Sequence, residues 1–110
     1  MKALLWASIA MLLSQGRADA EPVSGSLLYG WCIAPAESVQ SSFCLGFIMG
    51  VADMIVSQDL PLKVCIKGPS PLEIKDAVVK FMKEQPVEAR HQGGTTIVYA
   101  GLRKSFPCPQ

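Results

Sequence analysis

The centre of the chain reads Phe43-Cys44-Leu45-Gly46-Phe47-Ile48-Met49-Gly50-Val51-Ala52-Asp53. Apolar residues recur there at spacings of three and four, which is the pattern of a wide apolar face on an α-helix. The spacing predicts one long helix over about 37–58. Cys44, Ile48, Val51 and Ile55 share its predicted buried face. This helix is therefore expected to lie at the centre of the fold, with both sides partly covered.

Gly46, Gly50 and Asp53 lie on roughly the opposite face of the predicted helix. Each glycine inside a helix costs about 1 kcal/mol relative to alanine. The usual reason for such a cost is close packing in the core. The alternative is a contact with a partner, with Asp53 as its polar element. We expect core packing, and we keep the partner contact as the alternative.

Three shorter helices are predicted around this one. Residues 24–31 carry apolar side chains on one face, and Pro35 interrupts the helix. Residues 70–85 begin with a capping box, in which Ser70 is the N-cap, Pro71 the first helical residue and Glu73 the reciprocal partner. The expected buried stripe of this helix is Ile74, Ala77, Val78 and Phe81.

The last segment, Thr95 to Pro107, is predicted to be a helix capped by Thr95. Ile97, Val98, Gly101 and Leu102 form its apolar stripe. A strand over 95–99 competes, because this stretch is rich in β-branched residues, but no second strand is predicted to pair with it. The expected fold is all-α, a small domain of about four helices.

The N-terminus has the pattern of a secretory signal peptide. A basic start is followed by an apolar run over 3–13 and by Ala18-Asp19-Ala20, a small-x-small cleavage site. The run is too short to span a bilayer, which needs roughly 20 residues. We therefore expect a signal peptide over 1–20 and one exported domain over 21–110, located in a bacterial periplasm.

The exported part has no net charge. Loss of Lys2, Arg17 and Asp19 with the leader leaves eight basic and eight acidic residues. No basic stripe indicates nucleic acid or an anionic lipid surface. No later stretch is expected to span a membrane, so we predict neither nucleic acid nor membrane as a partner of the mature protein.

The four cysteines all follow the leader, at Cys32, Cys44, Cys65 and Cys108. Their spacing lacks the Cys-x-x-Cys pairs of zinc and redox sites, so we predict structural disulfides and no metal or cofactor. An antiparallel pair formed by the first two helices would bring Cys32 close to Cys44. The outer ends of the last two helices would bring Cys65 close to Cys108. We expect this connectivity among the three that four cysteines allow.

The sequence contains no catalytic constellation. His91 is the only histidine, and a general base needs a nucleophile and an orienting group within reach. No phosphate loop or dinucleotide fingerprint is present. The protein is therefore predicted to be a binding domain and not an enzyme.

The motifs Trp31-Cys32, Phe43–Asp53, Val64-Cys65-Ile66, Arg90-His91 and Phe106-Pro107-Cys108 occur in an order that resembles the Rap/Tai immunity proteins of bacterial type VI secretion. The resemblance covers nearly all of 21–110. It implies a periplasmic helical protein that binds a peptidoglycan amidase toxin and occludes its papain-like active-site cleft, often as a homodimer.

The resemblance does not identify an inhibitory loop, so we take the contact set from two expected exposed segments, around Gln85–Gln92 and Asp59–Lys63. The candidate partner-binding residues are Asp59, Lys63, Glu84, Gln85, Glu88, Arg90 and His91. The alternative function is a periplasmic binding or envelope-stress module on the same scaffold, because a fold does not by itself define a function.

Overall fold

The computed structural model describes residues 22–58 and 61–110. The predicted leader over 1–20 and the candidate Asp59 lie outside these residues. The described chain forms four α-helices and one 3-10 helix and no strand, which confirms the predicted all-α fold. In chain order these are α2 (Gly25–Cys32), α3 (Val39–Ser57), α4 (Pro71–Glu84), the 3-10 helix η1 (Val87–His91) and α5 (Gly94–Ser105).

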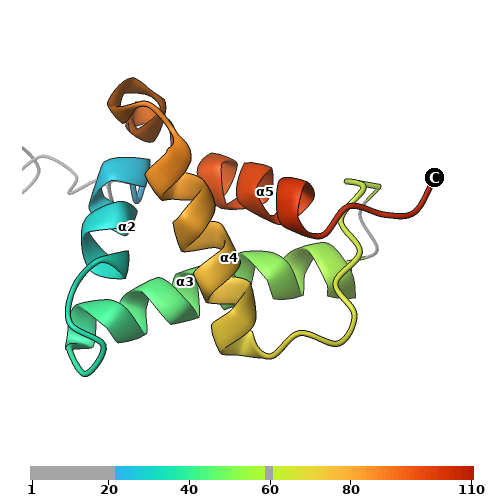
Figure 1. The fold of residues 1–110 in the computed structure, drawn as a ribbon, viewed down its shortest axis with the longest axis horizontal. Coiled ribbons are helices and arrows are strands. Elements are labelled where there is room, and N and C mark those ends of the chain that lie inside the picture. Colours follow the sequence, from blue (N-terminus) through green and yellow to red (C-terminus); the bar gives the residue numbers. More distant parts are fainter. Residues whose placement is uncertain (1–21, 59–60) are drawn as a thin grey trace, which may run out of the picture.

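The other three α-helices pack on α3, the longest helix (Figure 1). The short α2 contacts α3 and α5, and α4 crosses α3 and contacts α5 as well. Each of the four α-helices contributes to one core because each has an apolar stripe. The fully buried side chains are Leu28, Cys44, Ile48, Val78, Met82, Val98 and Leu102.

The helix ends follow the capping chemistry of the sequence at α4. The Ser70 hydroxyl accepts the Glu73 N–H at 3.3 Å, and the Glu73 carboxylate accepts the Ser70 N–H at 3.4 Å. This confirms the capping box. The last segment is a helix and not a strand, but the prediction of Thr95 as its N-cap is wrong. Gly93 is the N-cap, and glycine has no side chain that could form a capping bond. The Gly94 N–H donates to the carbonyl of Val23, just before α2, at 2.7 Å.

The interpretation of Gly46 and Gly50 as core-packing residues is wrong. Both are exposed, and a Cβ added at either one would meet no other atom within 4 Å. The opposite face of α3 is buried as expected, at Cys44, Ile48, Val51 and Ile55. The periodicity therefore identified the buried face of α3, but no element among the described residues covers its glycine face.

Two disulfides fasten the ends of the helices. Cys32 pairs with Cys44, with Cα atoms 5.0 Å apart, and Cys65 pairs with Cys108, with Cα atoms 4.8 Å apart. This is the connectivity that the helix order predicts. The first bond ties α2 to the start of α3, and the second ties the chain before α4 to the chain after α5.

By length and composition alone, α3 could cross a membrane, so the expectation that no segment after the leader meets these criteria is wrong. Its position explains the apolar composition in another way. α3 contacts α2, α4 and α5, and its Cys44 forms a disulfide with α2. An apolar helix at the centre of a small domain passes the same two criteria.

Candidate functional site

The segment between α4 and α5, residues 85–93 and hereafter the α4–α5 segment, projects from the helical body (Figure 1). The chain leaves the α4 axis because Gln85 is extended, with φ −81° and ψ 148°. Pro86 is also extended, and one 3-10 turn over Val87–His91 follows. A proline cannot continue the hydrogen-bond ladder of α4, so it forces this change of direction.

The base of the α4–α5 segment is fastened to the start of α2. Ser24 and Gly93 form an isolated antiparallel bridge. The Gly25 N–H donates to the Gln92 carbonyl at 2.7 Å, and the Gly94 N–H donates to the Val23 carbonyl at 2.7 Å. These bonds hold the C-terminal end of the α4–α5 segment against the body of the domain.

This attachment requires close backbone approach. A Cβ at Gly25 would lie 2.6 Å from the Arg90 carbonyl oxygen and 3.1 Å from the Gln92 carbonyl oxygen. A Cβ at Gly94 would lie 2.9 Å from the Val23 carbonyl oxygen. Real Cβ atoms essentially never lie under 3.0 Å from such atoms. Gly25 and Gly94 are therefore the glycines that packing demands, rather than Gly46 and Gly50.

Arg90 anchors the segment from within. Its guanidinium carbon lies 3.8 Å from the centroid of the Tyr29 ring, a cation–π contact. Its Nε donates to the Met82 carbonyl at 3.3 Å, and its own carbonyl accepts the Ser26 hydroxyl at 3.1 Å. Arg90 is half-buried, so the structure places it at the base of the protrusion and not at its tip.

Most side chains in the α4–α5 segment and at the end of α4 are open to solvent. Glu84, Glu88 and His91 are exposed, and Gln85 is half-buried. Val87 is also exposed, with 63% of its surface accessible. A fastened loop that presents an apolar residue between charged and polar ones is suited to protein recognition, because its conformation is set before binding and little ordering cost remains.

The structure does not bring Lys63 to this site. Lys63 lies next to the second disulfide, where its carbonyl accepts the Cys108 N–H, beyond the C-terminal end of α5. The α4–α5 segment precedes the N-terminal end of the same helix. α5 has 12 residues, so these two places are separated by about 18 Å of helix.

Two features of the site were not predicted from the sequence. Val87 was not among the candidates, although an apolar residue between Pro86 and Glu88 in a polar stretch is a usable signal. The bridge between Ser24 and Gly93 joins segments far apart in the chain. The paired Gly93-Gly94 marks its position, but glycine pairs more often indicate a simple break in a helix.

Comparison with known proteins gives one family. The model of the Rap1a immunity proteins matches residues 24–108. The match begins at the N-cap of α2 and ends at the last cysteine of the second disulfide, so it includes every described helix. No curated protein matches the chain.

Proposed function

Because the chain belongs to the Rap1a immunity protein family, we propose that it binds a peptidoglycan amidase effector of type VI secretion and inhibits it by occluding its active-site cleft. The family implies an immunity protein that binds a cognate toxin and is not itself an enzyme. The observation that carries the inhibitory mechanism is the fastened, protruding α4–α5 segment with Val87 exposed near its tip.

The compartment belongs to the same proposal. The leader pattern over 1–20 supports export, and cleavage after Ala20 would leave residues 21–110. Both disulfides require an oxidising environment such as the periplasm. A peptidoglycan amidase acts in that compartment, so the inhibitor and the toxin would meet there.

Substitution at the tip tests the occlusion mechanism. The double variant Val87→Asp and Glu88→Lys should raise the Kd for the cognate amidase, which we expect to be encoded beside the gene, by about 100-fold, because the loss of one central contact residue costs 2 kcal/mol or more. Both side chains are exposed, so the free energy of unfolding should change little. The measurements are Kd by calorimetry and residual peptidoglycan hydrolysis.

A matched control is Leu72→Asp, because Leu72 is 60% exposed and lies at the other end of α4 from the protrusion. It should leave inhibition intact. If the unmodified protein does not bind the amidase, the protein is a binding module for another partner. If it binds and the tip variant binds equally well, the α4–α5 segment is not the inhibitory element.

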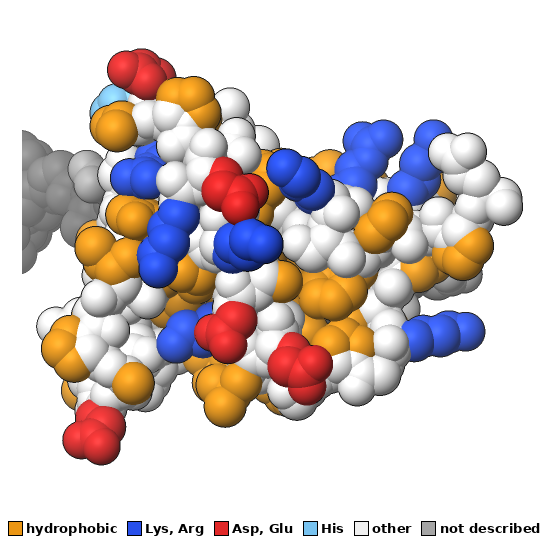
Figure 2. Space-filling model, in the orientation of Figure 1, with side chains coloured by type: hydrophobic (Ala, Val, Ile, Leu, Met, Phe, Trp, Pro, Cys, Tyr) orange, Lys and Arg blue, Asp and Glu red, His pale blue; other side chains and the backbone are white. Residues whose placement is uncertain are grey.

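We further propose that the glycine face of α3 joins two copies of the protein. Gly46 and Gly50 lie one turn apart with open space above them, so a second helix backbone can approach closely. A groove of about 420 Å³ adjoins this face, lined by Val23, Trp31, Ser42, Phe43, Gly46 and Phe47. Hydrophobic side chains are exposed over α2 and the start of α3 (Figure 2).

Gly50→Leu is expected to convert such a dimer to a monomer, seen as a halved mass in sedimentation or light scattering at micromolar concentration. The fold should be retained, because leucine favours helix by roughly 1 kcal/mol relative to glycine and the site is open. Gly30→Leu is the control, since Gly30 also has no atom within 4 Å of an added Cβ. A monomeric unmodified protein, or an unchanged mass for Gly50→Leu, contradicts the proposal.

A further inference from the structure

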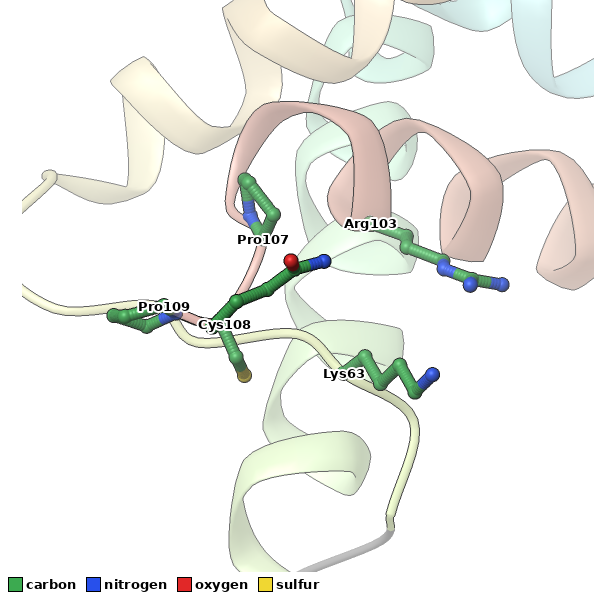
Figure 3. Close-up of a pocket in the computed structure, with 6 residues that line it drawn as sticks. Lys63, Arg103, Pro107, Cys108 and Pro109 are labelled. Atoms are coloured by element: carbon green, nitrogen blue, oxygen red, sulfur yellow. The ribbon is translucent and has the colours of Figure 1, made fainter.

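A cleft of about 340 Å³ lies beyond the C-terminal end of α5 (Figure 3). Its wall is formed by the chain on both sides of the second disulfide. The lining residues are Lys63, Arg103, Pro107, Cys108, Pro109 and Gln110. Two of them carry positive side chains, none carries an acidic side chain, and Figure 3 shows Lys63 and Arg103 extending on the same side.

The surroundings of the cleft reinforce its positive charge. No Asp or Glu occurs in 61–67 or in 103–110, the two segments that meet here, whereas both contain Lys or Arg. Acidic side chains are drawn over the other end and the middle of the visible face, and Lys and Arg alone mark the end where α5 finishes (Figure 2). The net charge of 21–110 is zero, so the basic side chains drawn at this end are concentrated there relative to the domain as a whole.

Lys63 has a backbone conformation that favours glycine. Its φ is +59°, and it is the only non-glycine residue in the described chain with a positive φ. A residue held in this region is strained, and such residues concentrate at functional sites. A lysine at a place where glycine would be unstrained indicates that its side chain is used.

The surrounding structure holds Lys63 in this conformation. The Lys63 carbonyl accepts the Cys108 N–H at 3.4 Å, and the next two residues are joined to the C-terminal segment by the Val64–Pro107 bridge and the Cys65–Cys108 disulfide. On the other side, the Tyr99 hydroxyl donates to the Leu62 carbonyl at 3.0 Å. The ammonium group of Lys63 is therefore presented from a rigid base beside Arg103.

We propose that this cleft binds a carboxylate side chain on the surface of the toxin, as a second contact apart from the α4–α5 segment. This inference rests on the proposed function. A guanidinium can bind a carboxylate with two parallel hydrogen bonds, and a nearby ammonium adds a point charge. The two sites lie at opposite ends of α5, so the partner must span about 18 Å along that helix.

Charge reversal tests the proposal. We expect Lys63→Glu and Arg103→Glu each to weaken binding of the cognate amidase about ten-fold at low ionic strength. The affinity of each variant should also depend less on salt than that of the unmodified protein, because close charge pairs control both association and affinity. Lys80→Glu is the matched control. It makes the same change in net charge on the exposed face of α4 and should change binding less than two-fold.

The variant Lys63→Gly distinguishes the contribution of the lysine side chain to binding from the effect of its backbone conformation on stability. Glycine accepts a positive φ without strain, so the melting temperature should stay unchanged or rise while binding still weakens. A change of one acidic residue of the amidase to lysine should then restore binding to Lys63→Glu. This rescue identifies the docked carboxylate.

The outcomes distinguish this inference from the proposed function. If the unmodified protein binds the amidase and the variants Lys63→Glu, Arg103→Glu and Lys80→Glu bind it equally well, the cleft is not a toxin-binding site. The proposed function is then unaffected. If all three variants lose a similar amount of affinity, the cause is the change in net charge, and this result also contradicts the proposed role of the cleft. If the unmodified protein does not bind the amidase, both the proposed function and the proposed role of the cleft are contradicted.

Discussion

Replacing Cys65 and Cys108 together with alanine is expected to lower the free energy of unfolding by about 4 kcal/mol. The bond closes a loop across a sequence separation of 43 residues. Opening this loop raises the entropy of the unfolded chain, and that gain accounts for the expected loss of stability. Cys65 is exposed and Cys108 half-buried, so little core packing is lost. Such a loss is a large part of the roughly 5–15 kcal/mol that stabilises a typical domain.

Guanidinium unfolding followed by circular dichroism measures this loss. The α4–α5 segment is fastened to α2 independently of this bond. The amidase should therefore still be inhibited at low temperature, whereas the contribution of Lys63 to binding should fall. A loss below about 1 kcal/mol would mean that the Val64–Pro107 bridge holds these segments together without the disulfide.

Gly25→Ala is expected to cost about 3 kcal/mol of stability, a large effect for the addition of one methyl group. The new Cβ would lie 2.6 Å from the Arg90 carbonyl oxygen. Relief of this clash must move α2 away from the α4–α5 segment, because the Arg90 and Gln92 carbonyls that obstruct the Cβ are backbone groups. Overpacking costs roughly 1–3 kcal/mol, and the hydrogen bond from the Gly25 N–H to the Gln92 carbonyl adds about 1 kcal/mol when it is broken.

Gly30→Ala is the matched control in the same helix. No atom lies within 4 Å of a Cβ at Gly30, so alanine should stabilise α2 by roughly 0.5–1 kcal/mol. The two variants should thus shift the unfolding midpoint in opposite directions. Inhibition of the amidase should weaken only for Gly25→Ala, because only that variant displaces the protruding segment. Equal stability of the two variants would contradict the close approach between Gly25 and Arg90.

The sequence predicted the helices and their ends well where the signals are local. The capping box at Ser70 needs residues three apart, and the buried face of α3 follows from spacings of three and four. The end of the chain was harder. Thr95 has the side chain of an N-cap, yet the bridge to Ser24 moves the helix start to Gly94. A tertiary contact overrode the local preference there.

The candidate site was predicted in part. The stretch around residues 85–92 does project from the body, but the structure turns Arg90 inward and places Lys63 at the other end of α5. Exposure and separation in space are properties of the packed chain. A single sequence does not contain them when no periodic pattern is present, as in the loops before α4 and α5.

The sequence by itself determined an all-α domain with four cysteines and the motif order of an immunity family. These properties follow from periodicity, residue chemistry and short spacings, which act over a few residues. The tertiary structure alone decided which glycines meet another backbone, and which segment is held out as a protrusion. Gly25 and Arg90 show the reason: they are far apart in the chain, and only the packing of α2 against the α4–α5 segment brings their backbones together.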